Sequence, residues 1–193
     1  MKKVIVVLVI LGLLALAFGN MYVTRRNQMV VYNQAIQAQW ANVNVVLERR
    51  ADLIPNLVAT VKGYAAQEVT VFGDVDKARE ALLAAKTPAD SIAANGQLDG
   101  ALGRLLAIAE NYPQLKSNEN FLQLQDELAG TENRIAVERR RYNDTIQQYN
   151  TYIGLFPNNI IARWAGFKAN NAYFQASAEA QQVPKVQFPG PQN

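Results

Sequence analysis

The longest hydrophobic repeat in the chain begins at Ile36 and advances in alternating steps of four and three residues to Leu82. This spacing places apolar side chains on one face of an α-helix, and it predicts a single amphipathic helix over roughly residues 30–85. The register continues through Pro55, which removes a backbone amide, so we expect a bend there rather than an end. Pro55 is therefore the predicted hinge.

Three further helices are predicted along the chain. Thr87 and Pro88 are typical of a helix start, and the second helix is expected to run to about Asn111. The third covers roughly residues 118–155 and repeats apolar side chains at intervals of seven. The fourth is expected over residues 158–180. Its apolar stripe consists of Ile160, Trp164, Phe167 and Phe174.

The N-terminal segment has the character of a membrane anchor. No charged residue occurs from Val4 to Phe18, and the segment reaches about 20 residues if Asn20 lies near the interface, which is enough to span a bilayer. Its membrane positions include Val4, Leu8, Leu11, Leu14 and Phe18. The alternative is a signal peptide cleaved after Ala17, where small residues resemble a cleavage site. We favour the uncleaved anchor because the helical pattern continues beyond Phe18.

The fold class predicted from these elements is all-α. No segment alternates at period two for long enough to indicate a sheet. The expected architecture is an N-terminal transmembrane helix followed by a long-helix antiparallel four-helix bundle. The expected regions are the anchor over 1–23, a helical stalk continuous with the bundle over 24–58, the bundle over 59–182 and an extended proline-rich tail over 183–193.

The lower part of the first predicted helix has no evident partner within the chain. That helix would span about 80 Å, against about 33 Å for the second and about 55 Å for the third, at about 1.5 Å per residue. The uncovered apolar residues are Ile36, Trp40, Val43 and Leu47. We interpret them as a coiled-coil seam for homo-oligomers near the membrane. The alternative is that the chain folds back at Pro55 and covers them itself.

Polar residues interrupt or flank the apolar faces, and a charge in such a place needs a partner, solvent or a function. The candidate interaction residues are Arg50, Asp52, Asn56, Glu68, Glu132 and Arg139. Asp52 or Asn56 can satisfy the turn that Pro55 loosens. If the first and third helices run parallel, pairs between them keep a nearly constant offset. The pairs Arg50 with Glu132 and Glu68 with Arg139 therefore cannot both form in one chain.

Composition excludes most of the familiar catalytic and metal chemistries. The chain contains no cysteine and no histidine, so thiolate and histidine metal sites and histidine-activated nucleophiles are excluded. We expect no catalytic residue, no cofactor and no metal. An enzyme that uses carboxylates alone, with Glu68 or Glu132, is left as an alternative. The net charge of +3 includes Lys2 and Lys3 beside the anchor, so no basic face for nucleic acid is indicated.

Four segments carry a family resemblance: RRADLIPNLVATVKGYAAQE at 49–68, AENYPQLKSNENFLQLQDELAGTENRIAVERRRYN at 109–143, YNTYIGLFPNN at 149–159 and VQF at 186–188. Together they resemble the LemA family of bacterial membrane-anchored proteins. The resemblance implies an N-terminal transmembrane helix and a helical bundle, with no established catalytic activity, cofactor or metal. None of the matching positions has a known role to carry over.

We therefore interpret the protein as a single-pass protein of the bacterial inner membrane. Lys2, Lys3 and the terminal amine face Arg25 and Arg26 across the membrane, and this slight positive-inside bias places the domain on the extracytoplasmic or periplasmic side. The domain is expected to be a non-catalytic interaction or scaffold module. Its expected partners are the lipid bilayer, further copies of the chain and an unknown protein, and not nucleic acid. The alternatives are a carboxylate-dependent enzyme and a secreted monomeric binding module released by signal cleavage.

Overall fold

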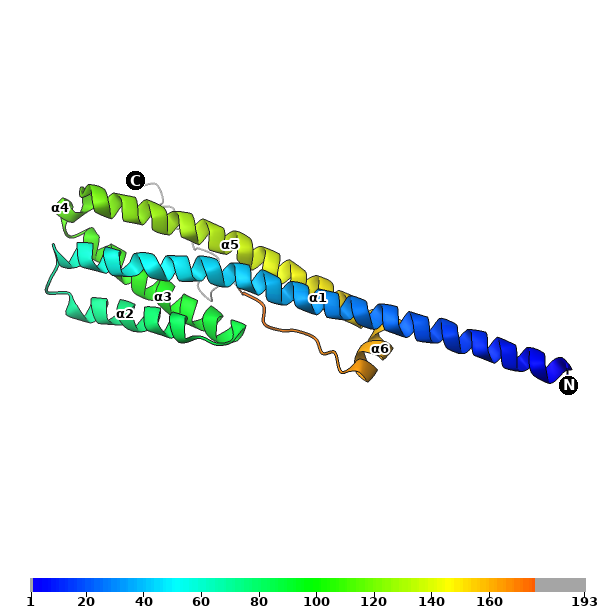
Figure 1. Cartoon of the computed structure of the whole chain (residues 1–193). Helices are drawn as coiled ribbons and strands as arrows, with labels where there is room; N and C mark the ends of the chain where they lie inside the picture. The colour runs from blue at the N-terminus through cyan, green and yellow to red at the C-terminus, as the bar shows by residue number, and fades with distance from the viewer. Residues whose placement is uncertain (1, 176–193) are drawn as a thin grey trace, which may run out of the picture.

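The computed structural model describes residues 2–175, and Figure 1 shows their arrangement. The helices are α1 (Lys2–Lys62), α2 (Val69–Ala84), α3 (Pro88–Ala109), α4 (Pro113–Lys116), α5 (Glu119–Gly154) and α6 (Asn158–Ala165). The described residues contain no strand, so the predicted all-α class is confirmed. α1, α2, α3 and α5 form an antiparallel four-helix bundle, and the N-terminal part of α1 projects beyond it. The predicted tail over 183–193 lies outside the described residues.

The first helix ends at Lys62, which corrects the prediction of one helix to residue 85. The chain turns over residues 63–68, and α2 runs back beside α1 (Figure 1). In the turn, the amide of Ala65 donates to the carbonyl of Val61 at 2.9 Å. A basic residue followed by Gly63 is a usual helix end. The repeat continues past this break because α2 has an apolar face of its own. The buried residues of α2 are Phe72, Val75, Ala78 and Leu82.

Pro55 lies inside α1, and the helix continues through it as predicted. Because proline has no amide N–H, the carbonyl of Ala51 loses its helical donor. Arg79 of α2 takes that place, since its Nε donates to the Ala51 carbonyl at 2.8 Å. Asp52 and Asn56 are exposed. The loosened turn is therefore satisfied by a neighbouring helix, and the bend itself stays a prediction.

The starts of α3 and α5 confirm the predicted boundaries. The side chain of Thr87 accepts a hydrogen bond from the amide of Asp90 at 3.2 Å, one residue before α3 begins at a proline. The side chain of Asn118 accepts from the amide of Phe121 at 3.0 Å. These side-chain acceptors satisfy amides that have no partner in the first turn of a helix.

The fourth predicted helix is much shorter than expected. α6 ends at Ala165, and Gly166 has φ of 79°, a left-handed conformation that favours glycine. Residues 167–175, which we call the strap, are not helical. The stripe predicted on this helix is divided as a result. Ile160 and Trp164 are exposed, Phe167 is half-buried and Phe174 is buried. Residues 176–180 of the predicted helix lie outside the described residues.

The strap runs back along α5 and is held there by two asparagines. The side chain of Asn150 donates to the carbonyl of Asn170 at 2.7 Å and accepts from its amide at 2.9 Å. The side chain of Asn143 does the same with Phe174, at 2.9 Å and 3.0 Å. Each asparagine side chain thus donates to the carbonyl and accepts from the amide of one strap residue, in the way that a neighbouring strand binds a backbone.

The lower part of α1 is covered by its own chain, which corrects the predicted open seam. Ile36, Val43 and Leu47 are buried and Trp40 is half-buried. α5 packs antiparallel along this stretch, and the rings of Trp40 and Tyr142 lie 5.3 Å apart. The expectation failed because residues 69–84 were assigned to the first helix, which made that helix too long for the others to cover. The strap was also assigned to a fourth helix, so its packing against this region was missed. Homo-oligomers lose this seam as their support and stay a prediction.

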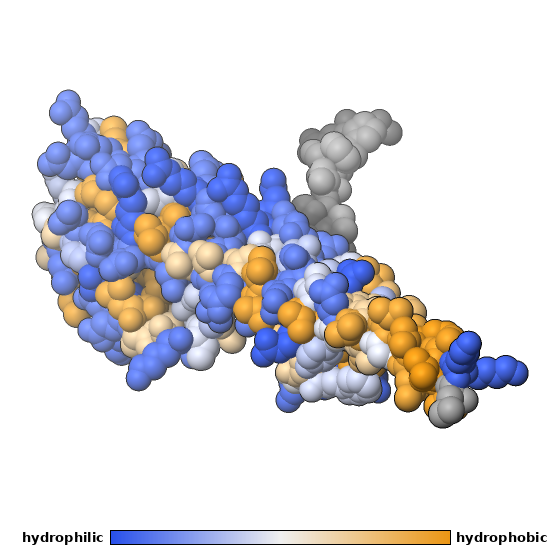
Figure 2. All heavy atoms as spheres, turned by 45° about the vertical axis from the view of Figure 1, so that its right-hand side comes forward, coloured by the Kyte–Doolittle hydropathy of each residue, from blue (hydrophilic) through white to orange (hydrophobic). Residues whose placement is uncertain are grey.

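The N-terminal part of α1 is long and apolar enough to cross a membrane. Its best window has a mean hydropathy of 2.7 and is 0% buried inside the structure. Figure 2 shows this part as a continuous apolar surface that contrasts with the largely polar bundle. The predicted membrane positions Val4, Leu8, Leu11, Leu14 and Phe18 are all exposed here. Such a surface is stable in hydrocarbon and not in water.

Candidate interaction site around Arg50

A buried arginine joins three helices in the middle of the bundle. Arg50 of α1 is 5% exposed. Its Nη1 lies 2.5 Å from Oδ1 of Asp99 on α3 and 2.9 Å from Oε2 of Glu132 on α5. The same atom donates to Oδ1 of Asn95 at 3.1 Å, and Nδ2 of Asn95 donates to Oδ2 of Asp99 at 3.1 Å. We call these four residues the Arg50 cluster.

The charges of the Arg50 cluster do not balance. Two carboxylates face one guanidinium, which leaves an excess negative charge. The side chains of Asp99 and Glu132 are 39% and 45% exposed, so solvent or an incoming cation can reach them. The Nε of Arg50 is buried and finds no partner among the described residues. Apolar side chains often stabilise a core as well as a buried ion pair does, so the Arg50 cluster is weak evidence for stability.

The sequence analysis found only part of the Arg50 cluster. It singled out Arg50 and Glu132, and the structure brings these two together. Asn95 and Asp99 were missed. The available signal was a polar residue, Asn95, on the stripe of α3 that also carries the buried Leu98 and Leu102. The rule that drew attention to Arg50 applies to that position as well, because a buried amide also needs partners.

The other candidate residues lie elsewhere. Glu68 occupies the N-cap position of α2 without a side-chain cap bond, at the far end of the bundle. Arg139 lies over the ring of Phe174 at 4.6 Å and donates to the carbonyl of Gln175 at 3.3 Å. Of the two pairs held to exclude each other, Arg50 with Glu132 forms. The assumption of parallel helices was wrong, because α1 and α5 are antiparallel, but the two pairs do not both form, since no ion pair of the described residues joins Glu68 to Arg139.

Two hollows flank the Arg50 cluster on the open side between α3 and α5. Together they form the surface that we call the α3–α5 face. The hollow nearer the α1–α2 turn has a volume of about 390 Å³ and is lined by Arg50, Leu106, Gln125, Asp126, Leu128, Ala129 and Glu132. The other has a volume of about 380 Å³ and is lined by Ile92, Asn95, Gly96, Asp99, Arg139, Phe174 and Gln175. Both lie at the lower end of the size range of ligand pockets in proteins.

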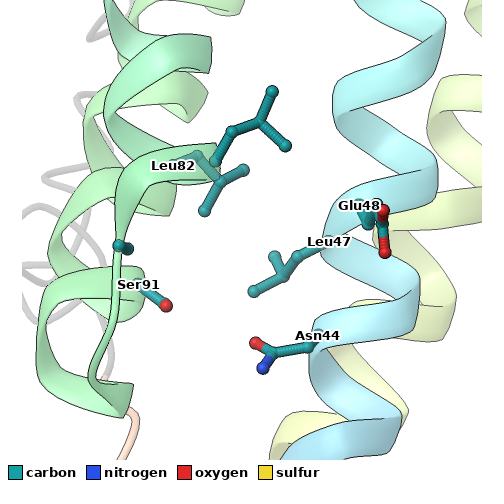
Figure 3. Close-up of a pocket in the computed structure, with 7 residues that line it drawn as sticks. Asn44, Leu47, Glu48, Leu82 and Ser91 are labelled. Carbon is teal, nitrogen blue, oxygen red and sulfur yellow. The ribbon is translucent and has the colours of Figure 1, made fainter.

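A third hollow of about 250 Å³ lies between α1 and the α2–α3 turn (Figure 3). Leu47 and Leu82 point into the gap from opposite sides, with Asn44 and Ser91 nearby. No ion pair of the described residues involves a residue that lines it. It therefore lacks the converging charges that distinguish the α3–α5 face.

Two tyrosines lie on the membrane side of the Arg50 cluster. Burial raises the pKa of Tyr142 above its ordinary value of 10.0, and burial raises the pKa of Tyr149 in the same way. The hydroxyl of Tyr149 donates to the carbonyl of Lys168 at 2.9 Å, whereas that of Tyr142 has no partner among the described residues. Both side chains stay neutral at physiological pH, so they contribute packing and not charge.

The carboxylates of the described residues form no group of three or more that could hold a metal ion. Glu68 and Glu132, the residues of the enzyme alternative, are on different levels of the bundle, since one begins α2 and the other lies in the middle of α5. They cannot act on one substrate group together. The arrangement around Arg50 is suited to holding a cationic group between exposed carboxylates.

A model of the LemA family matches residues 39–188. The chain belongs to the LemA family. The matched region includes α2, α3 and α5, the strap and all four residues of the Arg50 cluster. The apolar segment before residue 24 lies outside it, so the Arg50 cluster belongs to the family domain and not to the anchor.

Curated relatives of this LemA-family chain include magnetosome proteins. The chain is 31% identical to magnetosome protein MamQ 1 of Paramagnetospirillum magneticum, over 87% of this chain and 71% of the relative. It is 30% identical to magnetosome protein MamQ of Magnetospirillum gryphiswaldense, over 79% of this chain and 65% of the relative. It is 27% identical to protein LemA of Metamycoplasma hominis, over 83% and 73%. The family and the N-terminal apolar helix indicate a membrane-associated helical protein.

Proposed function

We propose that this LemA-family protein is a membrane-anchored, non-catalytic assembly module whose bundle forms homo-oligomers through the α3–α5 face. The observation that carries the proposal is the Arg50 cluster, which offers two partly exposed carboxylates to one guanidinium. A partner that brings a cationic side chain to this position balances the excess charge. The N-terminal lysines favour an extracytoplasmic domain, on the periplasmic side where there is an outer membrane.

A second copy of the chain can supply that cation. α5 carries three exposed arginines in its middle part, Arg134, Arg140 and Arg141. The α3–α5 face carries the acidic residues Asp99, Asp126 and Glu132 beside Arg50 and Arg139, which leaves an excess of one negative charge. Because both signs occur on the same domain, the acidic side of one copy is complementary to the basic stretch of another. Complementary charge of this kind gives register and specificity more than affinity.

Attachment to a bilayer favours such assembly. Anchored copies share one surface, which raises their effective concentration and lets contacts of modest area suffice. The apolar helix that provides the anchor is part of the same α1 that carries Arg50. Assembly through the α3–α5 face would therefore hold the anchors of neighbouring copies side by side.

The test measures the native mass of the full-length protein in mild detergent, at low and at high salt. The chain has no cysteine, so single cysteines can report the contact by disulfide cross-linking. Ala129→Cys places a thiol in the hollow beside Glu132. Val137→Cys is the position to pair with it on a second copy, because Val137 is exposed between the arginines of α5, and a mixture of the two variants should form the mixed disulfide. Gln123→Cys replaces Ala129→Cys in the control mixture, because Gln123 is also exposed on α5 but borders Leu53 and Asn56 of α1 on another side of the helix.

A discrete multimer that weakens in high salt, with a mixed disulfide between Ala129→Cys and Val137→Cys and none in the Gln123→Cys mixture, supports the proposal. A monomer at all protein concentrations contradicts it. A multimer that forms the disulfide only in the Gln123→Cys mixture places assembly on another face and contradicts the assigned surface. The intact mass of the same sample also decides between the anchored chain and the form cleaved after Ala17.

A further inference from the structure

α6 lies on the membrane side of the bundle. The rings of Tyr32 on α1 and Tyr152 on α5 lie 5.1 Å apart, and the two helices are antiparallel. Residues that follow Tyr152 are therefore beside the part of α1 that precedes Tyr32. α6 packs there against both helices, with Ile161 and Ala162 buried (Figure 1).

The outer side of α6 is apolar. Ile160 and Trp164 are four residues apart on α6, which places them along one side of the helix, and Phe156 lies in the turn just before it. Phe156 is 79% exposed and Trp164 is 67% exposed. Aromatic side chains that are this exposed to water carry a free-energy penalty, because each leaves a large apolar area unburied. This face therefore needs something to cover it.

The bilayer is already beside this face. An apolar segment that starts at Val4 and needs about 20 residues to span the hydrocarbon leaves it near Val23. α6 packs against α1, and Met21 and Tyr22 at the end of the apolar segment are partly buried against the core. A helix at this height lies at the level of the lipid headgroups. The outer side of α6 continues the membrane-facing surface of α1. The lipid bilayer is therefore the occupant that covers it.

The side chains of α6 suit a headgroup region. Tryptophan is enriched at the membrane–water interface, where its apolar ring can be buried while the indole N–H stays hydrated, and phenylalanine is common on the apolar face of helices that lie on a membrane. Arg163 on α6 and Lys168 just beyond it are exposed. Arg25 and Arg26 follow the anchor on α1. These cations are placed to meet lipid phosphates, as in amphipathic helices that lie on a membrane.

We propose that α6 is a second membrane contact, in which Phe156, Ile160 and Trp164 enter the interface of the bilayer that α1 crosses. α1 alone leaves the bundle free to rotate about one helix axis. A second contact to one side of that axis fixes which side of the bundle faces the membrane. This inference rests on anchoring by α1 and is independent of assembly through the α3–α5 face.

The two tryptophans of the chain, Trp40 and Trp164, make the test direct. Full-length Trp40→Phe, whose only tryptophan is Trp164, is reconstituted into phosphatidylcholine vesicles with or without bromine on the acyl chains. We expect brominated lipid to reduce Trp164 emission by about twofold, because an interfacial indole reaches the quencher. The matched control is Trp164→Phe, which keeps Trp40. That residue lies about 25 Å beyond the membrane boundary, at about 1.5 Å per residue, so its emission should not change.

Circular dichroism of both variants establishes that the bundle is folded. Trp164 emission that brominated lipid leaves unchanged, while aqueous acrylamide quenches it, would overturn the proposal, since α6 then faces water. Emission that neither quencher reduces would also overturn it, because a protein contact then covers α6. Quenching of Trp40 to the same degree as Trp164 would show a bundle that lies flat on the bilayer, which contradicts a contact specific to α6.

Discussion

Two regions of the bundle join the same pair of helices by opposite chemistry. At the Arg50 cluster, α1 meets α5 through a guanidinium and a carboxylate, and α3 completes the site. Nearer the membrane, α1 meets α5 through Trp40 and Tyr142, and Phe174 of the strap completes the site. We call the second region the aromatic end. The α2–α3 hairpin covers the first region and the strap covers the second.

The difference shows that the aromatic end has to exclude water, whereas the Arg50 cluster admits it. At the aromatic end the strap is a single non-helical segment, so large rings and paired asparagines must keep water out. At the Arg50 cluster three helices already enclose the site, yet charges are placed there with part of each carboxylate exposed. We infer that the aromatic end stabilises the fold, whereas the Arg50 cluster is retained for register and contact at some cost in stability.

The largest effect should come from Arg50→Met. Removal of the guanidinium leaves Asp99 and Glu132 near each other without a cation. Loss of one partner of a buried pair commonly costs 3–5 kcal/mol, and partial exposure of the carboxylates lowers the expected loss to about 3 kcal/mol. Chemical unfolding of the full-length protein in mild detergent measures it. Arg49→Met is the matched control, since Arg49 is exposed.

A loss for Arg49→Met as large as that for Arg50→Met would show that helix propensity, and not the Arg50 cluster, is responsible. The triple variant with Asp99→Asn and Glu132→Gln sharpens the comparison. It removes the repulsion between the carboxylates, so it should regain much of the stability that Arg50→Met alone loses.

A smaller effect is expected from Phe174→Ala at the aromatic end. The side chain is buried against Trp40 and Tyr142, and its removal should cost about 2 kcal/mol, less than for a central core phenylalanine because the strap can shift. Water then reaches Trp40, so its emission should move to longer wavelength when it is measured in a Trp164→Phe background, where Trp40 is the only tryptophan. Phe156→Ala is the control, because Phe156 is exposed. An unchanged Trp40 spectrum would show that the strap does not seal this end.

The parts of these two regions that the sequence predicted are those set by residues close together in the chain. Caps such as Thr87 and Asn118 act within one turn, so the starts of α3 and α5 were predictable. The break after Lys62 was not, because the four-three spacing of α1 happens to continue into α2 across the turn. Gly63 was the local signal against it. The charge of Arg50 marked a site, but which helices meet there depends on that break.

The strap was the hardest part to predict, for a physical reason. Residues 167–175 include aromatic residues at spacings that fit a helix, and Gly166 is the one local mark of a stop. Their conformation is set by Asn143 and Asn150, which bind the strap backbone from another helix. Such tertiary hydrogen bonds outweigh local preference, and the sequence around the strap does not record them.

A third prediction concerns the carbonyl of Ala51, one residue beyond Arg50. Arg79→Met removes its donor and should cost about 1 kcal/mol, the usual value for one hydrogen bond. In a Pro55→Ala background the restored amide can serve this carbonyl within α1, so the same substitution should cost less. A double-mutant cycle in denaturant measures the coupling. Equal costs in both backgrounds would mean that Arg79 acts by packing alone.

The smallest effects on stability are expected when Tyr142 and Tyr149, in the half of the bundle nearer the membrane, are each replaced by phenylalanine. The two replacements should differ in effect. Tyr149→Phe removes a hydrogen bond to the carbonyl of Lys168 and should cost about 1 kcal/mol at neutral pH. Tyr142→Phe removes a buried hydroxyl without a partner among the described residues, so it should be neutral or slightly stabilising. Denaturant unfolding at pH 7 gives both values. Equal losses would mean that the Tyr142 hydroxyl has a partner after all.

The same two variants have a defined pH dependence. Burial raises the pKa of both tyrosines, so above pH 10.0, the ordinary value, the unfolded chain releases their protons before the folded chain does. The folded state then binds more protons, and its stability must fall as pH rises beyond that value. Phenylalanine cannot ionise, so each variant should show a shallower alkaline decline than the parent protein. A parallel decline in all three would leave the aromatic end without a role in alkaline unfolding.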